Sequence, residues 1–588
     1  MLKDCLEVFK TLLDMNGDEF IMDSYIPADG TYVLVEPKND SFEIRETIDI
    51  RLDKKTKEIS GKSNSNFKKI CNYDYNSTLD IQKALDRKKV IHSNNYLSFF
   101  IKKESLTNGK LTDEIIDNYY EVLSNPLMKY SKSNDLKSKN ATRIYRTVEE
   151  ELGEVDIDTL ESLRNWIKEN IFNLNIDITG KNYLKIFFEY PIKDYEREGK
   201  RFLIPNIYNS NEFNITIKED IYGLPNDNMG LNSKKPYLEN KTRKVTVPYL
   251  VNNSDILLQK KFFDYLMNYA ALGRVNVYID SVNNEINAYE NGELPDKNFN
   301  GIFLRLKKGK EVEIHDYDII TGYKPSLTKK LEFKNILKID QSSKSISIQK
   351  YGNWGKVRDI QDRINEVFFS KFLTGNYFTE PGDLSINDGA LKSNLLLSRE
   401  TLFNWIYKGI DNGVFPVLNK VSLSLIKGSI ENGYIPKASH QFNLRWSLIN
   451  YFKGGKDMAD IIHDIKDTLR VKINSKITDK LDNDDEYYFA VGQLVNYLLS
   501  KSKGKNKPHS LANPFINGKN NNEIKEKLRK LYAKYSYDLD MNGKRFNNLY
   551  AMIIGYLPED KVNQDLIVGG YLSNNLIYES NKEERVNG

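Results

Sequence analysis

Residues that could hold a metal ion are few and scattered in this sequence. It contains five histidines, and two of them begin a His-Asp dipeptide, at His315-Asp316 and His463-Asp464. A metal phosphohydrolase needs several histidine and aspartate ligands that converge on the ion, so an isolated dipeptide supplies too few. His315 falls in a strand-like run and His463 in an amphipathic helix, where a structural role is the expected one. We therefore expect no metal site at either dipeptide.

The motifs of nucleotide hydrolysis and acyl transfer are also missing. The tripeptide that begins at Gly61 lacks the upstream glycine of a P-loop, because Thr56 occupies that position. No G-x-S-x-G nucleophile elbow occurs. Carboxylates are abundant, but most lie on the polar backs of predicted helices. A metal-dependent nuclease with an unrecognised carboxylate site therefore stays an alternative, and we predict a non-enzymatic protein without a cofactor.

Basic segments carry a stronger signal than the acidic residues do. Residues 501–548 contain ten lysines and two arginines against four acids. Four of these lysines alternate along one predicted loop: Lys501, Lys503, Lys505 and Lys507. Flexible cations of this kind neutralise phosphates without reading sequence, and the affinity that they give falls as salt rises. A solvated helix surface with many lysines is the competing interpretation.

The stretch 221–245 is a long polar loop that carries positive charge. Loops of this length inside a compact domain are usually either functional or disordered. Three asparagines precede a lysine pair: Asn226, Asn228, Asn232, Lys234 and Lys235. Asparagine can pair with adenine or donate in the minor groove, while lysine and arginine hold phosphates. Asparagine, glycine and proline are also ordinary turn residues, so composition leaves both interpretations open.

Length and composition limit the class of protein. A chain of 588 residues is too large for one core, and 40% hydrophobic residues argue against general disorder. The net charge of +4 is nearly neutral for this length, so any nucleic-acid contact must come from local patches. Cys5 and Cys71 match no disulfide or zinc pattern, which favours a reducing compartment. We predict a cytoplasmic protein without a signal peptide or membrane span.

The periodicity of apolar residues changes along the chain. Up to about residue 350, strand-like runs mix with helical ones, which indicates an α+β region. From about residue 357 helical patterns dominate. Four of them carry an apolar stripe: Met458, Ile462, Ile465 and Leu469; Tyr488, Val491, Val495 and Leu498; Ile524, Leu528, Leu531 and Tyr535; Phe546, Leu549 and Ile553. Stripes with a polar back are typical of a bundle. The sequence therefore predicts an α+β N-terminal body followed by an all-α C-terminal helical bundle, with the boundary near 355–395.

Several long runs resemble one known family. They are DSYIPADGTYVLV (23–35), KKVIHSNNYLSFFIKKESL (88–106), GLPNDNMGLNSKKPYLENKTRK (223–244), YYFAVGQLVNYLLSKSKGKNKPHSLANPFING (487–518), KRFNNLYAMIIGY (544–556) and GGYLSNNLIYE (569–579). They occur in order over nearly the whole chain. The sequence in these runs resembles the large subunit of the type I-B CRISPR Cascade complex.

This resemblance implies a non-catalytic subunit of an RNA-guided antiviral DNA surveillance complex. Such a subunit contacts the 5′ handle of the guide RNA (crRNA), checks the protospacer-adjacent motif (PAM) on duplex DNA and aids R-loop formation. It works with the backbone, handle-end and small subunits, and it recruits a helicase-nuclease in trans. The helical C-terminal part of the family resembles the small subunit and can be made from an internal start. Met458 is our candidate for such a start, although its helical spacing favours a core residue.

The resemblance leads to a domain and site prediction. Residues 1–390 would form the α+β body that meets the guide handle and the PAM duplex, and residues 395–588 the helical bundle. We predict groove contacts from Asn226, Asn228 and Asn232, phosphate contacts from Lys234, Lys235, Arg243 and Lys244, and single-strand contacts from Lys501, Lys503, Lys505 and Lys507. A structural subunit that scaffolds the complex without touching DNA is the third possibility.

Overall fold

The computed structural model describes most of the chain in two compact units. It covers residues 1–39, 41–78, 84–218, 220–226, 242, 246–247, 249–309, 311–340, 350–455, 457–504, 509–540, 543–559 and 561–579. The N-terminal unit comprises residues 1–290 and 301–319, and the C-terminal unit comprises residues 291–300 and 320–588. Within the covered ranges no helix is long and apolar enough to cross a membrane.

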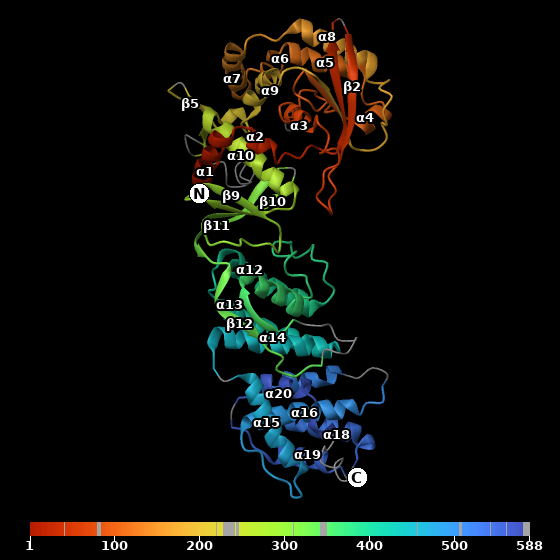
Figure 1. Cartoon of the computed structure of the whole chain (residues 1–588), viewed down its shortest axis with the longest axis vertical. Coiled ribbons are helices and arrows are strands. Elements are labelled where there is room, and N and C mark those ends of the chain that lie inside the picture. The colour runs from red at the N-terminus through yellow and green to blue at the C-terminus, as the bar shows by residue number, and fades with distance from the viewer. Residues whose placement is uncertain are drawn as a thin grey trace. The chain divides into compact units, whose positions relative to one another are not determined.

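The predicted fold class is confirmed. The N-terminal unit mixes strands and helices, and the C-terminal unit is mainly a run of helices from α12 to α20 (Figure 1). The C-terminal unit also takes in a small antiparallel pair, β12 (Ser326–Phe333) and β13 (Gly352–Lys356). This pair belongs there because β12 packs against helix α14. The compact units therefore divide near residues 290–320, earlier in the chain than the predicted change from mixed structure to helices.

A four-stranded sheet organises the first part of the N-terminal unit. Its strands are β1 (Gly30–Lys38), β2 (Ser41–Ile50), β3 (Ser98–Lys102) and β4 (Tyr183–Phe188), in the order β2-β1-β4-β3. Only β1 and β4 run parallel. Tyr32 to Val35 of β1 are fully buried, as a central strand covered on both faces requires. Gly30 is needed at the start of β1, because a Cβ there would overlap the carbonyl of Tyr183.

Helices surround this sheet, and three of the seven begin at a side-chain cap. They are α3 (Phe67–Tyr75), α4 (Lys103–Thr107), α5 (Asp113–Ser124), α6 (Leu127–Tyr130), α7 (Leu136–Leu152), α8 (Ile157–Asn170) and α9 (Ile192–Asn206). Thr112, Asp135 and Asp156 accept a hydrogen bond from a backbone N–H of the first turn of α5, α7 and α8. The buried stripes of these helices complete the core on the sheet.

The N-terminal unit contains a second four-stranded sheet. Its strands are β8 (Asn276–Asp280), β9 (Glu285–Tyr289), β10 (Phe299–Lys308) and β11 (Val312–Tyr323), in the order β11-β10-β8-β9. Helices α1 (Leu2–Asn16), α2 (Glu19–Met22) and α10 (Asn253–Ala271) share a hydrophobic core with it. A third small sheet joins β5 (Ile215–Ile217), β6 (Asp220–Gly223) and β7 (Val251–Asn252).

The C-terminal unit is built from helices of three to five turns with short helical connections. The longer helices are α12 (Gly389–Lys408), α13 (Val414–Glu431), α14 (Ile435–Lys453), α15 (Met458–Asn474), α16 (Asp484–Ser500), α18 (Asn521–Tyr535) and α19 (Lys544–Gly555). The shorter ones are α11 (Val357–Arg363), η3 (Ile364–Phe368), η4 (His509–Ala512), α17 (Asn513–Ile516), η5 (Ser536–Asp538), α20 (Gln564–Leu572) and η6 (Leu576–Tyr578).

Three of the four predicted apolar stripes are confirmed as buried faces of amphipathic helices. They lie on α15, α18 and α19. The prediction of a polar back is wrong for α16, because nearly every residue from Glu486 to Leu499 is buried. Helices α15, α18, α19 and α20 all pack against α16, so it has no solvent face along most of its length. Met458, the candidate internal start, is the first residue of α15 and is buried in the same core.

Helices α16 and α20 approach each other closely at two glycines. A Cβ added at Gly492 would overlap the carbonyl oxygen of Ile567, and one added at Gly570 would overlap the carbonyl oxygen of Phe489. Only glycine allows two helix backbones to come this near. The contact places the end of α20, and the chain that follows it, beside the last turns of α16.

Candidate nucleic-acid interface

Lys501 lies at the C-terminal end of α16, next to two tyrosine rings. Its Nζ is 4.8 Å from the ring centroid of Tyr497 and 5.6 Å from that of Tyr578. Both distances fall within the range in which an ammonium group is attracted to a ring face. A cation is also favoured here by the partial negative charge at the end of the helix. Lys501 is therefore held at a defined place rather than moving freely in solvent.

Tyr578 comes from the C-terminal segment, yet it is fixed against α16. Its hydroxyl lies 2.7 Å from Oγ of Ser500, and its ring centroid lies 5.2 Å from that of Tyr497. The residue remains 55% exposed, which is unusual for a large aromatic side chain held at two points. The ring thus offers accessible aromatic surface beside the cation of Lys501.

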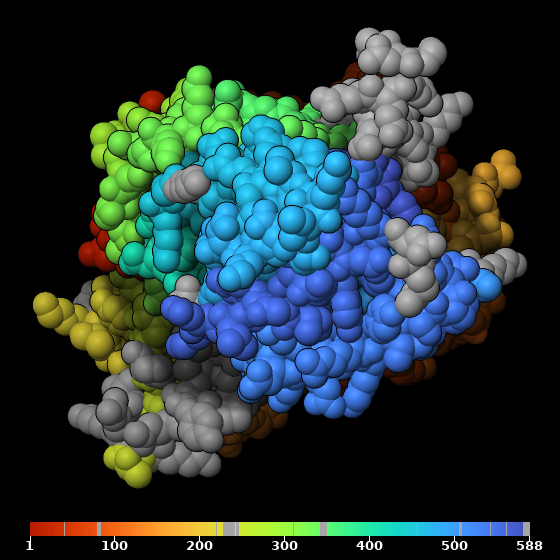
Figure 2. Space-filling model, turned by 90° about the horizontal axis from the view of Figure 1, so that it is seen from below, coloured from red at the N-terminus to blue at the C-terminus, as the bar shows by residue number. Residues whose placement is uncertain are grey.

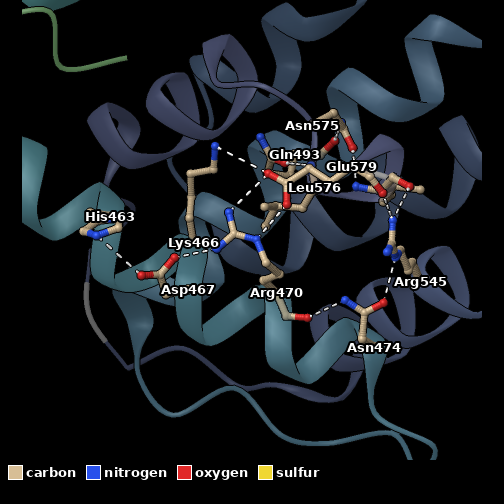
Figure 3. Close-up of polar contacts among 11 residues, drawn as sticks. His463, Lys466, Asp467, Arg470, Asn474, Gln493, Arg545, Asn575, Leu576 and Glu579 are labelled. Carbon is tan, nitrogen blue, oxygen red and sulfur yellow. Dashed lines mark hydrogen bonds and ion pairs between the residues drawn. The ribbon is translucent and has the colours of Figure 1, made fainter. Parts of the chain in front are cut away.

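A polar network fastens the segment that carries Tyr578 (Figure 3). Arg470 of α15 donates from Nε and Nη2 to the carboxylate of Glu579, over 2.7 and 3.2 Å. Arg545 of α19 donates to the backbone carbonyl of Glu579. Gln493 of α16 accepts a hydrogen bond from the N–H of Leu576 over 2.8 Å. Three helices therefore set the position of the tyrosine ring.

A second cation lies beside a second exposed ring. Nζ of Lys503 is 4.9 Å from the ring centroid of Tyr537, which follows α18 and is 59% exposed. The same amine lies 3.7 Å from a carboxylate oxygen of Asp538, and the lysine side chain is 71% exposed. A pair this exposed contributes little attraction, so the amine stays available to a phosphate.

The charge of Lys501 persists at any physiological pH. Partial burial lowers the pKa of its amine, but the neighbouring hydroxyls of Tyr497 and Tyr578 outweigh burial, and the pKa is raised overall.

The site combines two cations, Lys501 and Lys503, with two exposed tyrosines, Tyr578 and Tyr537. Proteins that bind single-stranded nucleic acid combine these two chemistries, because cations hold the phosphates and aromatic rings stack on bases. Figure 2 shows the molecule from below, with the later helices of the C-terminal unit coloured light to deep blue.

The structure describes only part of the predicted site. Lys501 and Lys503 lie in the C-terminal unit, whereas Asn226 lies in the N-terminal unit just after β6. Asn226 follows Pro225, whose backbone pairs with that of Tyr208, and it is half-buried. The other predicted contact residues lie outside the described residues: Asn228, Asn232, Lys234, Lys235, Arg243, Lys244, Lys505 and Lys507.

Three of the histidines each contact a polar side chain. His463 lies 3.5 Å from Asp467 on the next turn of α15, and Nδ1 of His509 lies 2.7 Å from the hydroxyl of Tyr571. His92 contacts the hydroxyl of Tyr183, and burial lowers its pKa. In the described part of the chain no group of three or more histidine, cysteine or carboxylate residues is placed to hold a metal ion.

The tyrosines of the site were not predicted from the sequence. Tyr537 lies within the basic segment 501–548, so its nearness to lysines is a signal that composition contains. Tyr578 gives no such signal, because only the packing of α16 against α20 brings it to Lys501. Comparisons of the chain with models of known protein families, with curated proteins and with solved structures give no significant match.

Proposed function

We propose that this protein is a non-catalytic, RNA-guided DNA-binding subunit. More specifically, we infer that it is the large subunit of a type I-B CRISPR Cascade, which recognises the protospacer-adjacent motif, aids R-loop formation and recruits a helicase-nuclease. The observation that carries the proposal is the placement of Lys501 and Lys503 beside the exposed rings of Tyr578 and Tyr537. The resemblance of the long sequence runs and the α+β body followed by helices support it.

The lysines and tyrosines of the site fit the function of such a subunit. Sequence specificity comes from pairing between guide and target, so the protein needs only to read a few base pairs and to hold backbones. Exchange of a DNA duplex for an RNA–DNA duplex is nearly balanced in free energy. Modest contacts to the displaced strand can therefore decide whether this exchange proceeds toward the RNA–DNA duplex. Two cations beside two exposed rings supply contacts of this strength.

The test uses the complex assembled with guide RNA and partner subunits, and compares wild type with Lys501→Ala/Lys503→Ala. Binding to target DNA is measured over a range of salt concentrations. Loss of two phosphate contacts should weaken binding and reduce the slope of log affinity against log salt by roughly 1.4. The matched control is Lys527→Ala/Lys530→Ala on α18, which removes the same charge from two other exposed lysines of the same unit.

Two outcomes would contradict the proposal. One is an unchanged salt slope in the Lys501/Lys503 variant, which would remove these lysines from the interface. The other is target binding that is the same when the whole chain is left out of the complex. Incubation of the isolated protein with DNA and a divalent metal separates the proposal from the nuclease alternative, because we expect no cleavage.

A further inference from the structure

The C-terminal segment, residues 573–579, is anchored on both sides of the Tyr578 ring. Before the ring, Nδ2 of Asn575 donates to a backbone carbonyl of α16 over 2.8 Å. After the ring, the carboxylate of Glu579 accepts two hydrogen bonds from Arg470 of α15. The ring between these anchors is 55% exposed, so packing covers less than half of it. The place of the ring in the site therefore depends on the anchors.

The second anchor uses the whole fork of the Arg470 guanidinium (Figure 3). Nε and Nη2 donate to the two carboxylate oxygens of Glu579 over 2.7 and 3.2 Å. Nη1 donates to a carboxylate oxygen of Asp467, one turn back on the same helix, and this bond orients the guanidinium. A planar guanidinium makes these bonds together, whereas the ammonium group of a lysine is a point charge without the bidentate geometry. Arg470→Lys would therefore keep the charge and lose the bidentate contact.

The contact between Arg470 and Glu579 is local to the surface of the C-terminal unit. Arg470 is 42% exposed and Glu579 is 30% exposed. Ion pairs at this exposure add little to the stability of a whole protein. Helix α15 is held instead by its buried stripe, which includes Ile462, Ile465 and Leu469. Loss of the contact should therefore free the end of the C-terminal segment while the helices stay folded.

We propose that Arg470 and Glu579 are positioning residues of the nucleic-acid site. Their contact holds the ring of Tyr578 where a base can stack on it, and so sets how strongly the site binds bases. It does not set how strongly the site binds phosphates, because Nζ of Lys501 also lies 4.8 Å from the ring centroid of Tyr497, which belongs to α16 itself. The inference rests on the proposed function, since it takes single-stranded DNA as the ligand.

An anchored ring binds a base more tightly than a free one. A free segment must be ordered by the strand that binds it, and ordering one residue lowers the affinity by a factor of about five or more. Stacking of one base on an aromatic ring raises the affinity by a comparable factor, about fivefold or more. Loss of the anchor should therefore remove most of the benefit of stacking at Tyr578.

The test compares the binding of the full chain to two fluorescent single strands of DNA of about 12 nucleotides, one normal and one abasic. Both strands carry the same phosphates, so the ratio of the two affinities reports stacking. With two tyrosines in the site, the wild type should prefer the normal strand at least about tenfold. Arg470→Lys should reduce this preference about fivefold. It should leave the slope of log affinity against log salt unchanged, because Lys501 and Lys503 remain.

Two controls separate positioning from a general effect on structure. Arg164→Lys changes an arginine of the N-terminal unit that likewise donates to two carboxylates, on α5 and α8, and it should alter neither the base preference nor the salt slope. In Tyr578→Leu, which has no ring to position, Arg470→Lys should cause no further change, and a further loss there would show that Arg470 acts by another route. Glu579→Gln breaks the contact from the other side and serves where Arg470→Lys lowers the melting temperature.

The positioning role would be overturned by an unchanged base preference in both Arg470→Lys and Glu579→Gln. A salt slope that is smaller by about 0.7 in Arg470→Ala would overturn it as well, because the guanidinium itself would then contact a phosphate. Both results differ from failure of the proposed function, which would appear as an unchanged salt slope in Lys501→Ala/Lys503→Ala.

Discussion

Lys185 shows how strongly a single residue can constrain the N-terminal sheet. It lies in the middle of β4 with only 6% of its side chain exposed, and it forms an ion pair with Asp74 of α3, which is 1% exposed. Its Nζ is 4.5 Å from the ring centroid of Phe100. Tyr25 donates a second hydrogen bond to Asp74 over 3.1 Å. Each charge therefore depends on the other, because neither has access to bulk water.

Replacement of Asp74 by asparagine should lower the free energy of unfolding by about 3 to 5 kcal/mol, because it leaves the ammonium of Lys185 buried without a counter-charge. Urea denaturation of the full chain measures this loss. The double variant Asp74→Asn/Lys185→Met should recover part of it. Lys68→Ala, which breaks an exposed pair with Glu19, is the control and should cost below about 1 kcal/mol. A small loss in Asp74→Asn would contradict the dependence of the two charges.

The two cysteines give a prediction about pH. Burial raises the pKa of both Cys5 and Cys71 to about 12, and the charge of Asp74 adds to the effect at Cys71. At pH 8 neither thiol should react with a thiol reagent until denaturant is added. Above about pH 8.5 the unfolded chain loses thiol protons that the folded chain keeps, so stability falls as pH rises toward 12. Rapid labelling of the native protein at pH 8 would show that one thiol is accessible.

At the scale of elements, periodicity predicted which helices exist better than it predicted their surroundings. The stripe at Met458 and Ile462 is the buried face of α15. The pattern misjudged α16, since its polar residues Glu486 and Gln493 are buried with partners rather than solvated. An apolar stripe identifies which positions are apolar, but it cannot show that the buried Gln493 donates to a backbone carbonyl of α20. The same limit applies to the site, where Lys501 was predicted from a local run and its contact with a ring of the C-terminal segment was not.

The close approach of α16 and α20 predicts an unusual response to alanine. In an exposed helix interior, glycine to alanine is stabilising by roughly 1 kcal/mol. Gly492→Ala should instead destabilise the protein by about 1 to 3 kcal/mol, because the new Cβ overlaps the backbone of α20. Gly555→Ala at the end of α19 is the control, since nothing lies within 4 Å of its Cβ position. Chemical denaturation compares the two variants, and equal stabilities would mean that the helices can separate without cost.

At the scale of the whole molecule, each unit has its own hydrophobic core. Compact units that each contain a hydrophobic core can unfold as separate cooperative transitions. We expect calorimetry of the full chain to resolve two transitions. Asp74→Asn should lower the midpoint of only one of them, and Gly492→Ala only that of the other. A single transition that both variants shift would show that the units fold as one cooperative body.

The glycine contact between α16 and α20 also has a consequence for synthesis. The two glycines are separated by about 80 residues, so a ribosome adding about 5–20 residues per second finishes α16 roughly 4 to 16 seconds before α20 exists to cover it. During that interval the side of α16 that carries Phe489, Gly492 and Gln493 has no α20 to pack against. The last part of the chain thus completes a core whose other helices were synthesised several seconds earlier. A chain released before residue 564 should keep that face open and sediment with aggregates, whereas the complete chain should not.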